Sequence, residues 1–465
     1  MRNFRKSLCI ILSVLLVLPF GLLCASAATA DYTLVSPYEN VVWDGENAWG
    51  LYKGNLHTHS TYSDAEVTYP ETIIEHYNQG YDFLAMADHG VTGRAWNEKQ
   101  PIIPLYLYQY IIGYTQTHLT DEQFAGITGG SYPLYDGTVR GDGMTCVTGA
   151  NELNYINITK SHVNGYFLPD GVGNGFEGGE NGHEIAVAFV DKHGGLSHIN
   201  HPGDWIGYDS IDEASDPENV RYFSEIILKY DSCLGFEIFN CKNSTEHYNR
   251  ILWDNMLMYT LPYGRTFWGF ANNDSHNFSE IDSSFMVFAL EENNVENIKD
   301  AMINGNFFAV ARRLDESEGI GPAEFIDACD KDVMYPTFTS VTTKDHSISV
   351  TVEDCNYIQW IANGDIIASQ DVNANSGVIT LDLDTIPGAE NFMYVRAEII
   401  GEGGMTCTQP IVLDNGEEKP AYESETTVDS ILADIEFKLK STRIYVILAE
   451  LISMIVDEIR DLINQ

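Results

Sequence analysis

The chain has 465 residues, of which 44% are hydrophobic, so it can bury the cores of two or three domains and is not an intrinsically disordered protein. Its 68 acidic and 25 basic residues give a formal net charge of −43, and a surface of that sign repels nucleic-acid backbones and anionic lipid headgroups. The composition therefore excludes nucleic acid as a partner, although a local metal site can still attract a small anion.

The first 30 residues have the features of a secretory signal peptide. Basic residues at the start precede a long apolar run, which ends in the small residues ASAATA. No later stretch reaches the roughly 20 apolar residues of a membrane-spanning helix. We therefore expect a secreted or cell-surface protein with no stable membrane insertion after the signal is cleaved.

Strand-like and helix-like stretches alternate from about residue 50 to residue 310. The segment 69–80 has a proline near its start and a glycine at its end, which predicts a helix, and the apolar segment 81–87 follows as a buried strand. Similar pairs recur down the chain and predict an α/β domain over residues 31–335, with a parallel sheet that is open or closed into a barrel. Residues 91–147 are rich in Tyr, Gly and Pro, and we expect them to form an insertion over one end of the sheet, with a short helix at LTDEQF.

The pattern changes after about residue 335. Residues 336–415 alternate apolar and polar side chains between turn signals, which predicts a small antiparallel β-sandwich. Residues 416–465 read as an acidic linker followed by an amphipathic helical tail. Since acidic residues on the tail would oppose anionic lipid, we expect it to pack on the body or to mediate self-association.

The stretch GNLHTHSTYSDA places His57 and His59 two residues apart. Side chains alternate along a strand, so both imidazoles would point to the same face, where a pair of them can hold a metal ion. The alternative interpretation is a polar strand end with two solvated histidines.

Further metal-ligand residue types follow the ends of other predicted strands, where active sites of α/β proteins gather. They are Asp64, His89, Glu152, His162, His201, Asp274 and His276. Mixed imidazole and carboxylate ligands suit Zn, Mn or Fe, and this number of ligands exceeds what one ion takes. The set predicts a multinuclear hydrolytic site in which Glu152 bridges two ions and a shared hydroxide is the nucleophile. Asp88 and His198 are expected to orient ligands or to lie in the core.

The motifs HTH…SD, DH, E followed ten residues later by H, HP and DSH resemble those of the polymerase and histidinol phosphatase (PHP) superfamily, over roughly residues 50–312. The resemblance implies a distorted (β/α)7 barrel with a trinuclear metal centre. It implies three ligand groups: His57, His59, Glu152 and Asp274 for the first ion, Glu152, His162 and His201 for the second, and Asp64, His89 and His276 for the third. The family often has a histidine where this chain has Asp64. The signal and the added sandwich resemble the secreted branch of the family.

These observations together predict a secreted phosphoesterase with two to three divalent ions, Zn, Mn or Fe, that hydrolyses a small phosphate mono- or diester. Glu152, Asp274 and His201 are the expected catalytic residues. Arg94 and Arg265 are candidates for contacts to the substrate phosphate, with surface ion pairs as the alternative. Two other functions stay open, a metal-dependent carboxyl or carbamate ester hydrolase and a non-catalytic cell-surface binding protein.

Overall fold

The computed structural model describes residues 32–101, 116–154, 161–175, 182–206, 211–240, 246–312 and 333–423. The predicted signal peptide and the predicted C-terminal helical tail lie outside these residues. In the described part of the chain, no helix combines the length and the apolar character that a membrane crossing requires.

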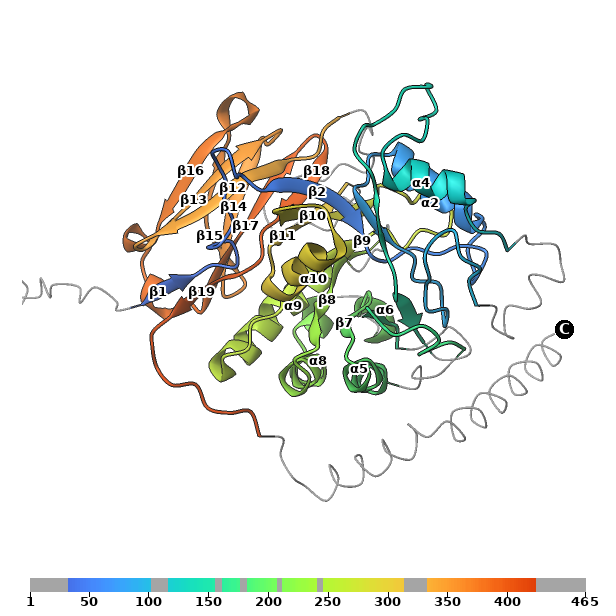
Figure 1. Ribbon diagram of the computed structural model, residues 1–465. Coiled ribbons are helices and arrows are strands. Elements are labelled where there is room, and N and C mark those ends of the chain that lie inside the picture. Colours follow the sequence, from blue (N-terminus) through green and yellow to red (C-terminus); the bar gives the residue numbers. More distant parts are fainter. Residues whose placement is uncertain are drawn as a thin grey trace, which may run out of the picture.

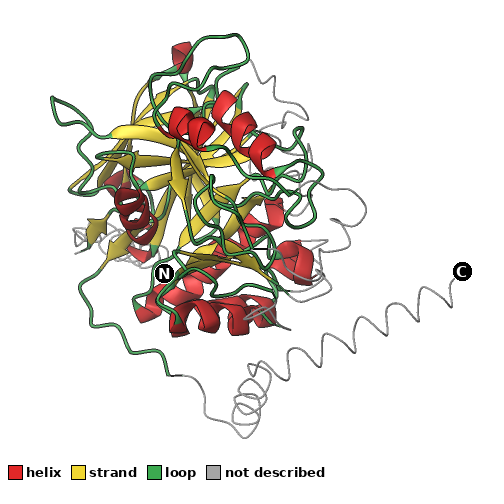
Figure 2. Ribbon diagram, turned by 45° about the vertical axis from the view of Figure 1, so that its right-hand side comes forward, coloured by secondary structure: helices red, strands yellow, loops and turns green. Residues whose placement is uncertain are grey.

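The fold is mixed α/β, with its strands in three sheets (Figures 1 and 2). The largest sheet contains β1 (Thr33–Val35), β2 (Gly50–Asn55), β3 (Phe83–Ala85), β4 (Thr145–Val147), β10 (Ser284–Leu290), β11 (Phe307–Ala311), β14 (Tyr357–Ala362), β15 (Asp365–Asp371), β17 (Tyr394–Gly401), β18 (Gly404–Cys407) and β19 (Ile411–Asp414). The second contains β5 (Asn151–Leu153), β6 (Val163–Tyr166), β7 (Leu196–Ile199), β8 (Cys233–Asn240) and β9 (Trp268–Asn272), and the third β12 (Thr337–Lys344), β13 (Ser347–Glu353) and β16 (Gly377–Asp382).

Helices connect many of these strands. They are α2 (Tyr69–Asn78), α4 (Asp121–Thr128), α5 (His183–Lys192), α6 (Gly203–Ile206), α7 (Ile211–Ala214), α8 (Pro217–Lys229), α9 (Glu246–Thr260) and α10 (Val295–Asn304), with short 3-10 turns at Leu261–Tyr263, Asn373–Asn375, Leu383–Thr385 and Ala389–Asn391. The helix expected at LTDEQF is α4. It begins after Thr120, whose hydroxyl accepts from the Gln123 backbone while the Gln123 side chain accepts in return, so two unpaired amides of the first turn are satisfied.

The prediction of a parallel sheet holds only for parts of the two larger sheets. Strands β2, β3 and β4 are parallel, and so are β7, β8 and β9. Strand β10, which the sequence analysis did not single out, pairs antiparallel with both β2 and β11. All residues of β8 and of β10 are buried, because each strand is covered on both faces, and this explains their nearly continuous apolar sequences.

The two larger sheets meet at two isolated bridges, where Thr58 pairs with Ser275 and His89 pairs with Glu152. Thr58 follows β2 and Ser275 follows β9, so the first bridge joins the carboxyl ends of two strands that are far apart in the sequence. The second bridge joins the segment after β3 to β5. Polar residues that follow β2, β3 and β9 are therefore brought to one place.

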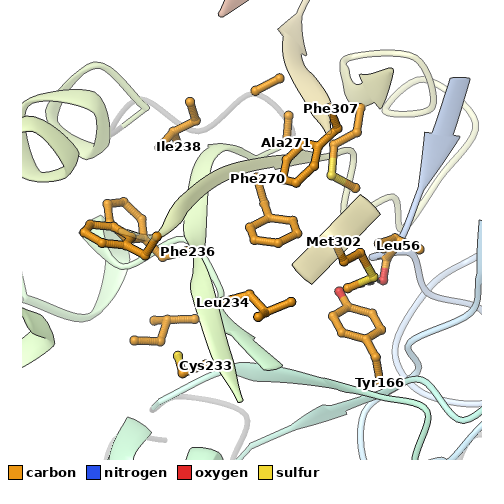
Figure 3. Packing of buried hydrophobic residues seen from close by; sticks show 14 of the residues in the cluster. Leu56, Tyr166, Cys233, Leu234, Phe236, Ile238, Phe270, Ala271, Met302 and Phe307 are labelled. Carbon is orange, nitrogen blue, oxygen red and sulfur yellow. Dashed lines mark hydrogen bonds between the residues drawn. The ribbon is translucent and has the colours of Figure 1, made fainter. Parts of the chain in front are cut away.

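A hydrophobic core lies beneath these bridges (Figure 3). It includes Leu56 from the segment after β2, Phe236 from β8, Phe270 from β9 and Phe307 from β11, all at most 1% exposed. Burying each such side chain contributes about 1.5–3 kcal/mol. The core fixes the strand ends from which the polar residues project.

The C-terminal strands form two layers. One layer is the sheet of β12, β13 and β16, but the other is continuous with the main domain, because β18 pairs with β11 and β1 pairs with β19. The predicted boundary at residue 335 therefore does not coincide with a break in the largest sheet.

Buried ion pairs join this layer to α9. Arg396 on β17 donates to Asp254 on α9 through Nε and Nη2, at 2.8 and 2.7 Å, and also pairs with Glu398. Glu398 is in turn paired with Arg250 of α9. Every charge in this group has an opposite partner, which buried charges require.

Candidate metal centre

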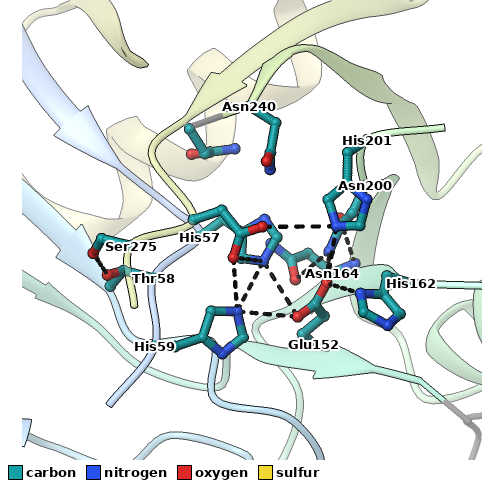
Figure 4. Close-up of polar contacts among 12 residues, drawn as sticks. His57, Thr58, His59, Glu152, His162, Asn164, Asn200, His201, Asn240 and Ser275 are labelled. Atoms are coloured by element: carbon teal, nitrogen blue, oxygen red, sulfur yellow. Dashed lines mark hydrogen bonds and ion pairs between the residues drawn. The ribbon is translucent and has the colours of Figure 1, made fainter. Parts of the chain in front are cut away.

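The structure brings all the predicted metal ligands to the carboxyl ends of β2, β3, β7 and β9 and to the adjoining β5 and β6. His57 and His59 follow β2, and both side chains are fully buried on the same side, as the alternation of a strand predicts. Figure 4 shows them turned toward Glu152 of β5, with His162 and His201 on its other side. The expectation of solvated histidines at a strand end is therefore wrong.

One carboxylate oxygen lies at the middle of the group. Glu152 Oε2 is 3.3 Å from His57 Nε2, 3.1 Å from His59 Nε2 and 3.0 Å from His89 Nδ1. The other oxygen, Oε1, is 2.9 Å from His162 Nδ1 and 3.7 Å from His201 Nε2. Glu152 is thus the residue that connects the two sides of the centre.

The structure contains three groups of potential metal ligands, and within each group the ligand atoms lie within 4.8 Å of one another. They are His57, His59, Glu152 and Asp274; His89, Glu152 and His162; and His59, Asp64, His89 and His276. The first is the set that the family resemblance implies for one ion. The third contains the implied set of Asp64, His89 and His276 and adds His59. The second contains His89 in place of the expected His201, because His89 lies closer to Glu152, at 3.0 Å against 3.7 Å.

Two ligands adopt backbone conformations that are rare outside glycine. His201 has a φ of 26° and Asp274 has a φ of 44°. Such conformations cost free energy and persist where the surrounding structure holds them. At Asp274 the backbone amide donates to the His57 carbonyl at 2.9 Å, which places the carboxylate beside His57 Nε2 at 3.1 Å.

The charges in the centre depend on one another. Burial alone would raise the pKa of Glu152 and of Asp274, but the surrounding imidazoles hold the pKa of both carboxyls well below their usual range. Conversely, burial opposes the charge on His57, while the neighbouring carboxylates raise its pKa. The carboxylates are therefore ionised and require positive charge beside them.

The donor set fits divalent metal ions. The Oδ1 atoms of Asp64 and Asp274 and the Nδ1 atom of His89 are buried within 3.0–3.3 Å of an ion-pair partner, but none of the three makes a well-formed hydrogen bond. His57 Nε2 and His59 Nε2 face each other at 3.1 Å, a spacing at which only one of them can carry a proton toward the other. Lone pairs that converge in this way are satisfied by cations, and imidazole with carboxylate suits transition metals and zinc.

Glu237 of β8 is a functional residue that the sequence analysis missed. Its Oε1 lies 2.8 Å from His57 Nδ1, its Oε2 accepts from Asn240 at 2.7 Å, and the His201 amide donates to Oε2 at 3.1 Å. The contact with Nδ1 fixes the proton of His57 on that atom and leaves Nε2 free for a metal ion. A charged residue inside the apolar strand CLGFEIFN is the signal that could have identified it.

Asp88 and His198 support the centre without joining it. Asp88 accepts from the Ser60 amide at 2.7 Å and from Ser63 Oγ at 2.7 Å, and Ser63 Oγ lies 3.1 Å from His59 Nδ1. His198 Nε2 lies 2.8 Å from the hydroxyl of Tyr166 in the core. Both placements agree with the expectation that these residues orient ligands or fill the core.

Neither predicted arginine contact is formed at the centre. Arg94 is 36% exposed and binds Asp170, with Nε 2.7 Å from Oδ1, so it makes the surface ion pair that was the alternative interpretation. Arg265 donates to the Cys233 carbonyl at 2.9 Å, at the amino end of β8. The ligands lie beyond the carboxyl end of that strand, roughly 20 Å away at about 3.3 Å per residue, so the prediction of Arg265 as a phosphate contact is wrong.

No family model matches the sequence, and no curated protein is significantly similar to it. Similar solved structures include a two-domain protein from Bacteroides vulgatus described as containing a PHP-like metal-dependent phosphoesterase, with 16% identity over 80% of this chain and 98% of that chain and a TM-score of 0.39. They also include a lesion-specific endonuclease, EndoQ, from Pyrococcus furiosus, with 17% identity over 55% of this chain and 56% of that chain and a TM-score of 0.28. A third is a protein from Bifidobacterium adolescentis described as a metal-dependent phosphoesterase, with 12% identity over 48% of this chain and 87% of that chain and a TM-score of 0.27. Since identities and TM-scores are low, the functional assignment depends on the site itself.

Proposed function

We propose that the chain is a metal-dependent phosphoesterase of the PHP type, which hydrolyses a small phosphate mono- or diester. The observation that carries the proposal is the position of Glu152, whose two oxygens face imidazoles of His57, His59 and His89 on one side and of His162 and His201 on the other. A carboxylate in this position can be shared by two cations, which a structural single-ion site does not need.

The remaining ligands complete the centre around this carboxylate. Asp274 Oδ1 lies 3.1 Å from His57 Nε2 and 3.0 Å from His59 Nε2, so it completes a group with two imidazoles and Glu152. Asp64 is 3.3 Å from both His89 Nε2 and His276 Nε2, which makes the third group. We infer that these groups hold two to three Zn, Mn or Fe ions, which when bound would activate a water and neutralise charge on a phosphoryl oxygen.

The protein's own residues would then hold the reacting groups in place. Glu237 and the Asp88–Ser63 pair fix the rings of His57 and His59. We assign catalysis to Glu152, Asp274 and His201; His201 Nε2 lies 3.7 Å from both Glu152 Oε1 and Asp274 Oδ2. No serine or cysteine nucleophile is required.

We also propose that the two larger sheets form the distorted barrel of the PHP type. The bridges Thr58–Ser275 and His89–Glu152 support this, because each joins one sheet to the other. Secretion through residues 1–30 and self-association through the C-terminal tail remain further parts of the proposal, supported by the sequence pattern.

A metal analysis combined with a substrate panel tests the proposal. The purified full chain should contain more than one transition-metal or zinc ion per molecule and should hydrolyse aryl phosphate mono- or diesters. Glu152→Gln should lose both properties, whereas His346→Ala, which alters a partly buried histidine paired with Asp384 in the C-terminal strands, should keep both. Activity on aryl carboxyl esters alone would establish the alternative hydrolase, and a chain that takes up less than one ion would favour a binding protein.

A further inference from the structure

His183 lies beside the metal centre although it belongs to none of the ligand groups. It is the first residue of α5, which ends at Lys192 and leads through Gly194 and Gly195 directly into β7. A helix that packs along a strand after such a short turn runs antiparallel to it. The amino end of α5 therefore lies level with the carboxyl end of β7, which His201 follows (Figure 1).

His162 lies at the same end. It directly precedes β6, and β6 is antiparallel to β7, so the start of β6 is next to the end of β7. The pKa of His183 is lowered to about 3, first by burial and then by the charges of His162 and His201. His183 is thus neutral, and the topology places it at the end of the sheet where His162 and His201 lie.

The ring of His183 is held in one orientation, with one nitrogen unused. The side chain is 3% exposed, its Nδ1 is 3.2 Å from the Tyr222 hydroxyl, and its ring packs on Phe223 at 5.2 Å. Its Nε2 is buried without a hydrogen-bond partner in the described structure. A buried polar atom without a partner is costly and calls for an explanation.

The tautomer follows from Tyr222. Burial raises the pKa of Tyr222 to about 12, while a hydrogen bond from the His183 backbone amide opposes the shift, so the phenol keeps its proton and its oxygen already accepts. We therefore assign the phenol as the donor to Nδ1, which is the arrangement that uses its one proton, and the single proton of the neutral imidazole is then on Nε2. The unused nitrogen is a hydrogen-bond donor.

The helix adds a second feature that attracts an anion. The N-cap of α5 is Gly182, which has no side chain to cap the first turn. The acidic residue of that turn, Glu184, is paired with Lys229 and accepts from Tyr230 at 3.3 Å, so its charge is compensated. In the described part of the chain no side chain caps this ten-residue helix, so the partial positive charge at its amino end can interact with a ligand.

We propose that His183 Nε2–H and the amino end of α5 bind an anionic phosphoryl oxygen of the substrate, beside Glu152, His162 and His201. This inference rests on the proposed phosphoesterase function. It explains how the phosphate is recognised when neither Arg94 nor Arg265 reaches the centre. A neutral donor also suits a position next to metal ions, since it adds no further positive charge.

Calorimetric titration with inorganic phosphate tests the proposal on the metal-loaded full chain. His183→Leu keeps much of the ring's volume and removes the donor, so phosphate should bind about 10-fold more weakly or worse, as for the loss of a hydrogen bond to a charged group. His183→Gln can return an N–H near the position of Nε2 and should recover part of the affinity. His193→Gln, at the other end of α5 and bonded to the Phe189 carbonyl, is the matched control and should bind phosphate as the original chain does.

Metal content and melting temperature accompany each titration. All variants should retain their metal ions; loss of an ion from His183→Leu would show that His183 is a ligand and would overturn the proposal. Unchanged phosphate affinity in His183→Leu would also overturn it, while leaving the phosphoesterase function intact if the original chain cleaves aryl phosphates. If His183→Leu fails to fold, Tyr222→Phe is the variant that tests the proposal. Without the hydroxyl the imidazole loses its fixed tautomer, so phosphate should bind more weakly, and unchanged phosphate affinity in Tyr222→Phe would refute the proposal. An original chain that neither binds phosphate nor cleaves aryl phosphates would refute the function as well.

Discussion

Replacing Glu237 with glutamine tests whether the metal centre depends on the residue that orients His57. The substitution preserves shape but removes the negative charge and exchanges one acceptor oxygen for an amide donor. That donor would face groups that already donate, namely His57 Nδ1 at 2.8 Å, the Asn240 amide at 2.7 Å or the Asn272 amide at 2.9 Å. At least one of these contacts becomes repulsive.

The expected effect on metal binding can be bounded from these contacts. Hydrogen bonds to a charged group contribute about 1.5–3 kcal/mol each, and loss of an outer-shell partner typically lowers metal affinity about 10- to 100-fold. We expect Glu237→Gln to weaken metal binding within that range, because His57 then loses its fixed orientation and its tautomer. Competition with a chromogenic chelator measures the affinity, and aryl phosphate hydrolysis at saturating metal measures what remains.

Asp254→Asn is the matched control, because Asp254 is another buried carboxylate but belongs to the ion-pair group between α9 and β17. It accepts from Arg396 at 2.7 Å and from the Tyr394 hydroxyl at 2.6 Å. The substitution should lower the melting temperature without changing metal affinity. Metal affinity that is the same in Glu237→Gln as in the original chain would refute the reasoning that this carboxylate orients the ligand.

Three further predictions concern the centre and the ion-pair group. Asp274→Asn should lower kcat by about 100-fold or more, since Oδ1 loses its charge beside two imidazoles, and steady-state kinetics on aryl phosphates measure it; a kcat within about 3-fold of the original would contradict the assignment. Removal of metal by a chelator should lower the melting temperature, because ions at about 100 times their Kd stabilise the folded chain by about 2.7 kcal/mol, and restoring the metal should restore the transition; no shift would argue against a resident ion. Glu398 is buried beside Arg250 and Arg396, whose charges outweigh the effect of burial and lower its pKa to about 2. Because this folded pKa lies below the unfolded value of about 4.3, the ionised group stabilises the fold by about 3 kcal/mol above pH 4.3, and this contribution is lost as the pH falls toward 2. The free energy of unfolding, measured by urea titration at each pH, should therefore fall less steeply with decreasing pH in Glu398→Gln than in the original chain. An identical pH dependence in the two chains would contradict the prediction.

Local pattern was sufficient to locate many of the elements and the predicted metal ligands. The segment CLGFEIFN is β8, and VENIKDAMINGN contains α10, since the apolar periodicity and the flanking turn residues of each describe only its own neighbourhood. The same holds for His57 and His59, whose shared face follows from the alternation of a strand. The order of motifs then indicated which residues belong together; the structure brings eight of the nine into groups of potential ligand atoms, and His201 lies 3.7 Å from Glu152 beside them.

Long-range pairing could not be predicted in this way. Three pairings depend on contacts between segments far apart in the chain: β10 is antiparallel to β2, β18 extends the main sheet into the C-terminal layer, and β1 pairs with β19. Edge pairing leaves little trace in the sequence of either strand. The role of Glu237 and the distance of Arg265 from the centre were hidden for the same reason. A side chain's residue type states which chemistry it can perform, but its neighbours are decided only when separate strands pack against one another, since the free energy that selects their pairing comes from the burial of both.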